Sequence, residues 1–333
     1  MSDAPDIEPS ETPFASLAPE VVIESVEAAG ERCDGRVLAL GSYENRVYQV
    51  GREDSEPVVV KFYRPHRWSD AAIREEHAFA LELAAAEVPV VAPLVIGGET
   101  LLTHSGFRYA IYPRRGGRWP ELGSTDDRVW MGRFIGRLHA TGSARTFVHR
   151  PALDVGTFGV DARTAVLESG FLPEYLIDRY AEVTETLLAR LTDELQPQLA
   201  RARLRIHGDC HRGNILWTEA GPHFVDLDDC VTGPAVQDLW MLLAGSREEM
   251  RVQATDLLEG YGQFAAFNLA ELALIEPLRA LRLIHYAAWL ARRWHDPAFP
   301  RAFPWFAEPR YWEQHVAVLQ EQLTVVDEER FSI

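Results

Sequence analysis

A polar loop between two short apolar segments constrains this chain more than any other feature of its sequence. Residues 204–206 (LRI) lead into the loop 207–214 (HGDCHRGN), and residues 215–217 (ILW) lead out of it, so one strand enters the loop and another leaves it. A further apolar segment, HFVDLDD, contains a strand that ends at Asp226. Pairing of these strands would bring Asp226 beside Asn214 at the end of the loop.

Two carboxylates and an amide in this arrangement suit phosphoryl transfer. That reaction needs a carboxylate to orient the attacking hydroxyl and accept its proton, and oxygen ligands for the Mg²⁺ that neutralises phosphate charge. Asp209 fits the first role, and Asn214 and Asp226 fit the second. The competing interpretation is a surface loop of Asp and Asn residues of the kind that turns use, which leaves the second strand unexplained. The sequence therefore predicts an ATP- and Mg²⁺-dependent phosphotransferase.

The order of apolar patterns predicts an α+β chain of two lobes. A helix at 19–29 precedes a sheet of about five strands, and a long helix capped by Ser69 or Asp70 is inserted after the third strand. The strand-like segments are 36–40, 46–50, 57–63, 89–96, 99–104 and 107–113. Helical spacing then appears at 126–142, most of 173–200, 235–245, 248–264 and 272–294. We expect a disordered tail at 1–14, a β-rich nucleotide-binding lobe at 15–115 and a helical catalytic and substrate lobe at 116–333.

The β-rich lobe contains candidates for the nucleotide side of the site. A kinase needs a strand lysine that pairs with the α and β phosphates and a helix glutamate that holds this lysine. Lys61 follows the apolar run 57–60, and Glu76 lies in the helix that comes next, with Glu75 as the competing choice.

Two further segments of this lobe are candidates for nucleotide contact. The segment LGSYENRVYQV has no G-x-G-x-x-G pattern, but a hairpin there can offer backbone N–H groups and the Ser42 hydroxyl to phosphate. An ordinary polar hairpin is the alternative. The segment YAIYPRRGGR should connect the lobes, and adenine would bond to backbone near Tyr112 to Arg114 unless the segment is a plain linker.

Composition excludes several other classes of protein. The chain of 333 residues carries a net charge of -17, from 33 basic and 50 acidic residues, whereas duplex nucleic-acid binding needs a concentrated basic surface. Three widely spaced cysteines do not indicate a disulfide framework or a zinc site. The acidic start of the chain is unlike a signal peptide, and no apolar run is long enough to cross a bilayer. We therefore expect a cytoplasmic monomer that binds neither nucleic acid nor membrane.

The motif resembles that of a known family. HGDxHxxN followed by an apolar-apolar-Asp strand end is similar to the signature of the aminoglycoside phosphotransferase and choline kinase-like family, which shares the protein-kinase fold. The segments GSYENRVYQV, VVVKFYRPHRW, EEHAFALEL, FVDLDDCVTGPAVQDLWMLL and EPLRALRLIHYAAWLARRW resemble the bacterial stress response kinases within this family, from about residue 19 to residue 315.

The resemblance carries expectations about individual residues. It implies that Asp209 is the proton acceptor, that Asn214 and Asp226 bind Mg²⁺ and that Ser42 lies at the ATP site. It also implies a Ser/Thr protein kinase that phosphorylates protein substrates, including itself. Gly41 stands where the family has Asn, so the resemblance weakens at that position.

Five further side chains near the motif need an interpretation. Asp238 anchors the catalytic loop in the family, or it interacts with a helix dipole. Asp228 could assist metal binding, and Cys210 is either a packed thiol or a redox-sensitive one. His211, like the histidine at 207, is expected to shape the loop through backbone hydrogen bonds.

The acceptor cannot be derived from the motif alone. Four arginines of the helix at 272–294 could bind an acidic or phosphorylated acceptor, or they could pair with carboxylates of neighbouring helices: Arg279, Arg282, Arg292 and Arg293. Besides a protein kinase, a small-molecule kinase for an amino alcohol, sugar or aminoglycoside-like substrate remains open. So does a nucleotide-binding regulatory protein without turnover.

Overall fold

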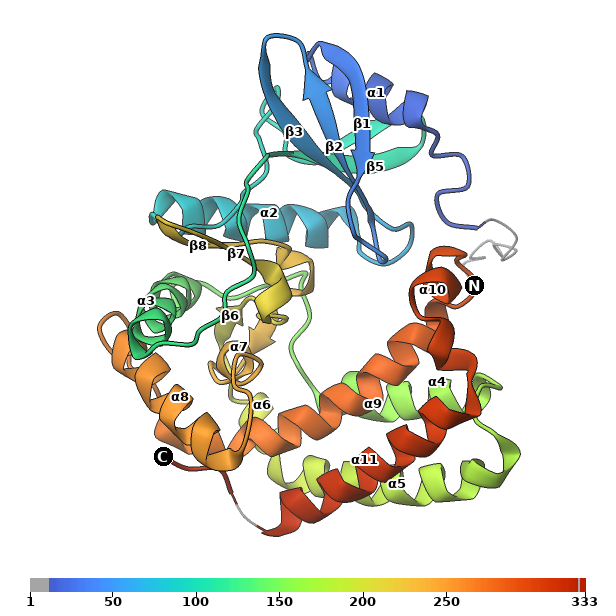
Figure 1. The fold of residues 1–333 in the computed structure, drawn as a ribbon, viewed down its shortest axis with the longest axis vertical. Coiled ribbons are helices and arrows are strands. Elements are labelled where there is room, and N and C mark those ends of the chain that lie inside the picture. Colours follow the sequence, from blue (N-terminus) through green and yellow to red (C-terminus); the bar gives the residue numbers. More distant parts are fainter. Residues whose placement is uncertain (1–11, 329) are drawn as a thin grey trace, which may run out of the picture.

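The computed structural model describes residues 12–328 and 330–333, which form two lobes joined by an extended segment (Figure 1). Residues 1–11 of the expected tail lie outside the described residues. Phe14, at the end of that expected tail, is buried and its ring lies 6.3 Å from that of Phe107. Phe14 therefore belongs to the apolar core of the first lobe, not to a tail.

The first lobe is built on an antiparallel sheet with the strand order β1-β2-β3-β5-β4. Its strands are β1 (Cys33–Ala39), β2 (Arg46–Arg52), β3 (Ser55–Phe62), β4 (Leu102–His104) and β5 (Phe107–Pro113). Helix α1 (Pro19–Ala28) begins with a proline, which needs no amide partner in a first turn, and packs its apolar face on the sheet. Because β3 is central, Lys61 pairs with Val47 on one side and Ala110 on the other.

Residues 89–96, which were expected to form a strand, do not join the sheet. Val90 makes an isolated bridge with Phe224 of the second lobe, and Ile96 lies in another. Pro89 and Pro93 have no amide hydrogen, so the segment cannot supply a continuous strand ladder. The expectation of about five strands holds, but this segment is not one of them.

Helix α2 (Asp70–Ala85) lies between the sheet and the second lobe (Figure 1). The Ser69 side chain accepts the amide of Ala72 and so caps the helix. Ile73 packs in a cluster with residues of the sheet. Further along the helix, three residues enter an apolar core shared with the second lobe: Phe79, Ala80 and Leu83. Helix α2 therefore connects two apolar cores.

The second lobe is mainly helical. Its longer helices are α3 (Thr125–Gly142), α4 (Asp161–Glu168), α5 (Ile177–Glu194), α8 (Arg247–Tyr261), α9 (Ile275–Arg293) and α11 (Pro309–Glu328). Its short helices are η1 (Gly156–Val160), η2 (Glu174–Leu176), α6 (Gln196–Leu199), η3 (Arg212–Asn214), η4 (Leu227–Asp229), α7 (Gln237–Trp240), η5 (Leu269–Leu274), α10 (Ala298–Ala302) and η6 (Pro304–Ala307). Two small antiparallel pairs carry the motif: β6 (Leu204–Ile206) with β9 (Val231–Gly233), and β7 (Ile215–Thr218) with β8 (Gly221–Phe224).

Two helical segments differ from expectation. The helix expected at 235–245 shrinks to the four residues of α7, because the chain then turns toward the capped start of α8 at Ser246. Helix α11 was not predicted, although Trp312, Val316 and Leu319 follow helical spacing and are buried.

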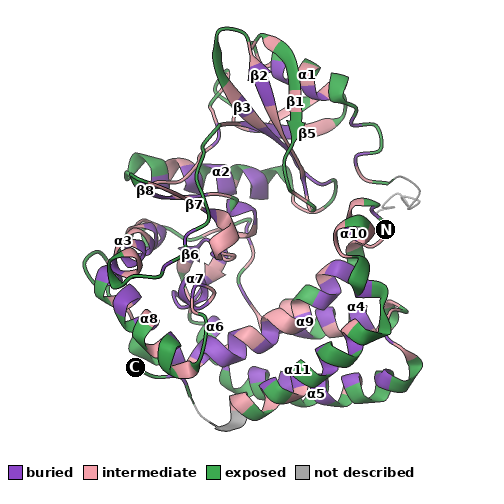
Figure 2. Ribbon diagram, viewed as in Figure 1, coloured by how far each residue is buried: buried purple, intermediate pink, exposed green. Residues whose placement is uncertain are grey.

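Helix α9 runs through the middle of the second lobe. Figure 2 shows buried positions along most of its length, where it packs against α4, α5 and α11. Its buried residues include Leu278, Leu281, Ile284 and Leu290. This packing fixes the helix, so the side chains on its remaining face are presented from a rigid support.

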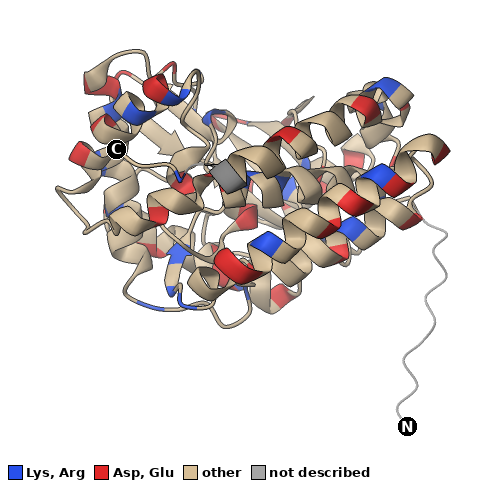
Figure 3. Cartoon of the chain, turned by 90° about the horizontal axis from the view of Figure 1, so that it is seen from below, with Lys and Arg blue, Asp and Glu red and all other residues tan. Residues whose placement is uncertain are grey.

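Charged residues of both signs are interspersed along the helices of the second lobe when it is viewed from below (Figure 3). That arrangement agrees with a net charge of -17 that is not concentrated in one region of this side. Across residues 12–328 and 330–333, no helix combines the length and the apolar character that crossing a bilayer requires.

Candidate active site

The loop between β6 and β7 is held in place by backbone geometry that glycine permits. Gly208 has a φ of +84°, and a Cβ atom there would lie 2.2 Å from the carbonyl oxygen of Asp229. Only glycine adopts this conformation at so close a contact without strain. Asp209 follows directly, and Asn214 closes the loop through a bond of 3.0 Å from its side-chain nitrogen to the Asp209 carbonyl oxygen.

A buried carboxylate anchors the same loop from below. The two oxygens of Asp238 accept the amides of His207 and Gly208, both at 2.8 Å. One of these oxygens also lies 3.0 Å from Nε2 of His139. Asp238 is fully buried and makes the loop contacts that the family resemblance implies. It also lies in the first turn of α7, so the interaction with a helix dipole holds as well.

Asp209 itself lies among cationic and polar partners. Arg282 of α9 donates to its Oδ1 at 2.7 Å, and Nε2 of His211 lies 3.4 Å from its Oδ2. Burial alone would favour the protonated acid. His211 and Arg282 outweigh burial and hold the pKa of Asp209 well below its usual range. The carboxylate is therefore ionised at neutral pH. It can accept a proton from a bound hydroxyl, but it does so as an anion that already accepts hydrogen bonds.

Asp226 stands where β8 leads into η4, next to the loop. The amide of Val225 donates to the Asn214 carbonyl at 3.0 Å, and this bond places the two candidate metal ligands side by side. Asp226 has φ 59° and ψ 62°, a left-handed conformation that aspartate tolerates better than most residues. Its side chain is half exposed, so the carboxylate faces the space between the lobes.

Lys61 reaches from the sheet to this carboxylate. Its Nζ lies 2.9 Å from Asp226 Oδ1, 3.1 Å from Asp228 Oδ1 and 3.9 Å from Glu76 Oε1. Burial by itself favours the neutral amine. The three carboxylates reverse that preference and hold the pKa of Lys61 well above its usual range. A permanent positive charge is thus fixed where both lobes meet.

The two neighbouring glutamates of α2 have different contacts. Glu76 is buried beside Lys61, and burial raises its pKa to about 7 because Lys61, at 3.9 Å, compensates only part of the cost. Glu75 instead accepts three backbone amides of residues 148–150, at 2.6 to 2.7 Å. Of the two candidates, Glu76 is the one in contact with the lysine.

The hairpin between β1 and β2 contributes a residue that sequence reasoning missed. The Ser42 hydroxyl donates to the Asn45 carbonyl at 3.3 Å, within its own turn. Asn45 is buried, and its side-chain nitrogen donates to Asp228 Oδ2 at 3.2 Å while its oxygen accepts the amide of Arg64. Asn45, not Ser42, therefore links the hairpin to the carboxylate cluster. No local pattern marks this asparagine as different from an ordinary turn residue.

The segment between the lobes places its side chains away from the motif. Tyr112 Oη lies 2.8 Å from Tyr63 Oη and 3.5 Å from His77 Nε2, within the first lobe. Arg114 donates to Gln49 on β2 at 3.0 Å and is exposed. The backbone contacts predicted for this segment stay a prediction.

An arginine outside the motif binds the acidic residues that follow Asp226. Arg67 contacts Asp228, and it also donates to Asp229 at 2.5 Å. Burial favours protonated Asp228, but Arg67, Lys61 and Arg150 hold its pKa well below the usual range. Asn45 and Arg67 contact Oδ2 of Asp228, and its Oδ1 lies 3.1 Å from the Lys61 nitrogen. These cationic and polar neighbours favour a structural role for Asp228 over metal binding.

Cys210 is buried behind the loop, and burial raises the pKa of its thiol well above the usual range. A protonated, inaccessible thiol is a packed side chain, not a reactive one. Burial of Cys210 therefore favours its interpretation as a small packed side chain over a redox-sensitive thiol.

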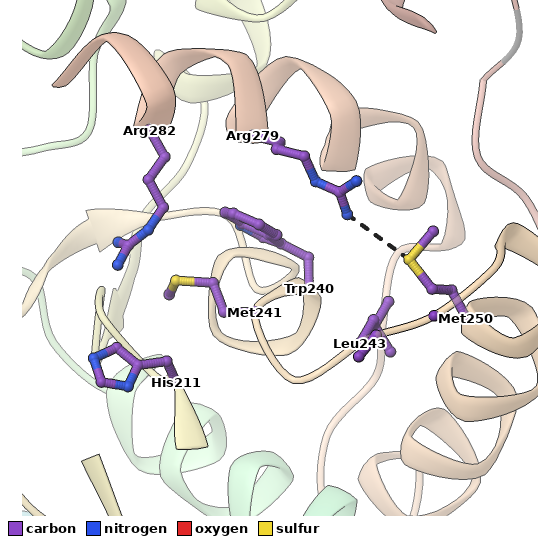
Figure 4. Close-up of a pocket in the computed structure, with 9 residues that line it drawn as sticks. His211, Trp240, Met241, Leu243, Met250, Arg279 and Arg282 are labelled. Carbon is purple, nitrogen blue, oxygen red and sulfur yellow. Dashed lines mark hydrogen bonds between the residues drawn. The ribbon is translucent and has the colours of Figure 1, made fainter. Parts of the chain in front are cut away.

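A cavity of about 430 Å³ lies next to α9, which contributes Arg279 and Arg282 to its lining (Figure 4). Its lining consists of His211, Trp240, Met241, Leu243, Ala244, Gly245, Met250, Arg279 and Arg282. Asp209 does not line the cavity, but two lining residues, Arg282 and His211, contact its carboxylate and so connect the cavity to it. The other two arginines noted in this helix point elsewhere: Arg292 donates to the Asp161 carbonyl, and Arg293 pairs with Glu44.

The donor set next to Lys61 fits a hard divalent cation. The side-chain nitrogen of Asn214 is bound to Asp209, which turns its oxygen the other way, and Asp226 offers carboxylate oxygens beside it. Among the residues that the structure describes, no three His, Cys, Asp or Glu side chains form a closed metal site. Two oxygen ligands suit Mg²⁺, which retains water and phosphate oxygens.

The fold and this arrangement define a kinase of the aminoglycoside phosphotransferase type. The family model described as "Phosphotransferase enzyme family" matches residues 36–275, and the chain belongs to this family.

Curated relatives extend over nearly the whole chain. "Stress response kinase A" of Salmonella typhi is 47% identical over 315 residues and covers 95% of both chains. The protein of Escherichia coli strain K12 with the same description is 46% identical over the same share. The Salmonella typhimurium relative is described as "Serine/threonine protein kinase RdoA" and is 47% identical. These relatives confirm the resemblance to stress response kinases.

Solved structures confirm the fold at lower identity. Amicoumacin kinase hAmiN, in complex with AMP-PNP, Ca²⁺ and its ligand, has a TM-score of 0.69 at 20% identity, and the match covers 94% of both chains. A microcompartment-associated aminopropanol kinase has a TM-score of 0.65 at 18% identity, with 93% of this chain and 99% of that one covered. At such identity the likeness concerns the fold.

Proposed function

We propose that this chain is an ATP- and Mg²⁺-dependent serine/threonine protein kinase of the bacterial stress response, able to phosphorylate itself. The observation that carries the proposal is the meeting of Lys61, Glu76 and Asp226 with the loop of Asp209 and Asn214. The name of the Salmonella typhimurium relative supports a protein acceptor. The complex of amicoumacin kinase with AMP-PNP and Ca²⁺ supports a nucleotide and a divalent cation.

In this mechanism each residue has one task. Lys61, held by Glu76, binds the α and β phosphates, and the hairpin with Ser42 covers them. Asn214 and Asp226 would hold Mg²⁺, which when bound neutralises phosphate charge. Adenine would bond to backbone between Tyr112 and Arg114.

The acceptor side depends on Asp209. This carboxylate orients the acceptor hydroxyl and takes its proton as the hydroxyl oxygen bonds to the γ-phosphorus. The bond from the γ-phosphorus to the bridging oxygen breaks, and ADP leaves with that oxygen. Of the two oxygens of Asp209, Oδ1 accepts from Arg282 and Oδ2 has no contact with that arginine.

Transfer of label from ATP to a generic protein substrate and to the chain itself tests the proposal. Asp209→Asn should lower turnover by about 10²- to 10⁴-fold, the range for loss of a general base. Asn214→Ala and Asp226→Ala should each lower turnover by orders of magnitude and raise the Mg²⁺ requirement. Glu76→Gln should also lower turnover, because it removes the carboxylate that holds Lys61. Glu75→Gln is its control, because Glu75 contacts backbone and not the lysine. Full activity of Asp226→Ala would refute the site.

A small-molecule kinase is the second candidate, favoured by the structural neighbours that are named for amicoumacin and aminopropanol. ADP release with an amino alcohol, without labelling of any protein, would establish it in place of the first. A nucleotide-binding regulator would bind ATP tightly and release no ADP with any acceptor. That candidate is disfavoured because Lys61, Asp209, Asn214 and Asp226 are all present.

The proposal includes a setting for the activity. We place the kinase in the cytoplasm, where ATP is available and where its three unpaired cysteines would stay reduced. It would act as a monomer on Ser/Thr residues of proteins and would not bind nucleic acid. Size-exclusion chromatography with light scattering tests the monomer, since a mass near 75 kDa instead of the 37.5 kDa of one chain would contradict it.

A further inference from the structure

The cavity beside Asp209 has a positive lining in a strongly acidic protein. Two of its nine lining residues are the arginines Arg279 and Arg282, and none is an aspartate or glutamate. The whole chain carries 50 acidic against 33 basic residues, so a lining without carboxylates departs from the average surface. A cleft lined by charges of one sign attracts ligands of the opposite charge, so this cavity should attract anions.

Arg282 contacts the Asp209 carboxylate and also lines the cavity. One terminal nitrogen donates to Asp209 Oδ1 at 2.7 Å, and the side chain is 40% exposed. A guanidinium has five N–H donors, so one bond to Asp209 leaves donors for a second anion. In Figure 4 the side chain extends from α9 toward His211 on the opposite wall. An anion in the cavity would therefore meet this guanidinium next to the hydroxyl acceptor position.

Arg279 stands one helical turn earlier and carries charge that its neighbours only partly compensate. Its guanidinium lies 5.6 Å from the ring centre of Trp240 and contacts the sulfur of Met250 at 3.8 Å, both neutral partners. The carboxylate of Glu276 is 3.5 Å away, but it also accepts from Gln322 at 2.9 Å. Figure 4 shows Arg279 directed toward Met250, whereas Arg282 extends toward His211, so the two arginines point to different parts of the lining.

We propose that this cavity selects a peptide acceptor with an anionic side chain close to the phosphorylated serine or threonine, and that Arg282 exchanges Asp209 for that anion. The inference rests on the proposed protein-kinase function. In the exchange, the anion of the acceptor takes the guanidinium, and the released Oδ1 of Asp209 receives the hydroxyl. Arg279 binds a second anionic group one turn earlier on α9. A polycationic acceptor would face two like charges and is rejected.

Three serine peptides that differ only in the flanking residues test this: one with glutamates, one with glutamines and one with lysines. The wild-type chain should phosphorylate the glutamate peptide with kcat/KM about tenfold or more above the glutamine peptide, since a charged hydrogen bond contributes about that much. The lysine peptide should be poorest. A phosphoserine in place of glutamate supplies the same anionic chemistry, and its preference over glutamate would identify phosphate as the source.

Arg282→Gln should reduce the glutamate preference to within about twofold, and Arg279→Gln should reduce it less. Arg292→Gln is the matched control, because Arg292 lies on the same helix, bonds to the Asp161 carbonyl and does not line the cavity. The charge reversal Arg282→Glu should favour the lysine peptide. This reversal is a readout that a merely structural arginine would not give.

The outcomes separate the two proposals. Equal use of all three peptides by the wild-type chain would overturn charge selection while leaving the kinase function intact. An equal fall for all peptides in Arg282→Gln would also overturn it. Labelling of no peptide and no protein, with ATP turnover on a small alcohol, would overturn the protein-kinase function itself and the inference with it.

Discussion

Replacing Asp296 with asparagine should destabilise the protein more than the loss of an exposed ion pair would. Asp296 follows α9 and its side chain is fully buried. Both of its oxygens accept from Arg46 of β2, at 2.8 and 2.9 Å, and Arg64, just after β3, donates at 2.5 Å. The amide of Ala298 adds a bond of 3.0 Å. One carboxylate thus neutralises two arginines of the first lobe.

The magnitude follows from what the substitution leaves behind. Asparagine keeps the size and one acceptor but removes the charge, so two largely buried guanidiniums lose their common counter-ion. Removing one partner of a buried pair costs about 3–5 kcal/mol. Arg64 retains Glu44 at 3.0 Å, which places the expected loss near the lower end, at about 3 kcal/mol.

Urea unfolding followed by circular dichroism measures this loss. Asp70→Asn is the matched control, because Asp70 pairs with Arg108 at 2.8 Å but is 54% exposed, and its loss should stay under about 1 kcal/mol. Adding Arg46→Met to Asp296→Asn should restore part of the stability, since one unpaired charge is removed. A loss in Asp296→Asn no larger than in the control would refute the reasoning, because it would mean that water solvates both guanidiniums.

Three shorter predictions concern other parts of the molecule. Burial lowers the pKa of His315 from 6.5 to about 4, so its contribution to stability is complete above pH 6.5 and is lost as pH falls toward 4. Between pH 7 and pH 5 the free energy of unfolding should fall by about 2 kcal/mol through His315, and this fall should be absent in His315→Phe. Unfolding curves measured across that range test the prediction, and the same pH dependence in the variant and the wild type would contradict it. Gly208→Ala should cost at least about 2 kcal/mol in urea unfolding and abolish transfer, because its Cβ would meet the carbonyl of Asp229 at a positive φ; wild-type stability would disprove the strain. Iodoacetamide at pH 8 should leave Cys210 and Cys230 unmodified by mass spectrometry until the chain unfolds, since burial raises the pKa of both thiols, whereas rapid labelling of Cys210 would restore the redox interpretation.

Local patterns predicted the parts of the site that depend on short-range geometry. The run of β-branched and aromatic residues around Lys61 indicated a strand, and the motif between two strands indicated the loop that carries Asp209 and Asn214. Both depend on residues close in sequence, where turn chemistry and apolar periodicity are informative. The choice of Glu76 over Glu75 rested on the family resemblance, since helical periodicity alone does not say which of two adjacent residues faces the lysine.

Contacts between distant segments could not be predicted in the same way. Asn45 meets Asp228 across 183 positions, and Arg46 meets Asp296 across 250. A polar hairpin residue and an aspartate before a proline look like ordinary turn residues until the lobes are placed together. The strand predicted at 89–96 was wrong for a local reason. The apolar composition of the segment suggested a strand, but its two prolines lack the amide donors that a strand needs.

Helix α2 has a consequence for how the two lobes can move. Its residues Phe79 and Leu83 share an apolar core with the second lobe, whereas the sheet reaches that lobe through ion pairs such as the one at Asp296. Apolar packing resists sliding, but ion pairs can separate and be hydrated. Ile73 of α2 also packs with Ala110 of the sheet, so the helix is held by apolar contacts on both of its sides. Separation of the lobes would therefore begin at the ion pairs, and a spectroscopic ruler placed across Arg46 and Asp296 would report it directly.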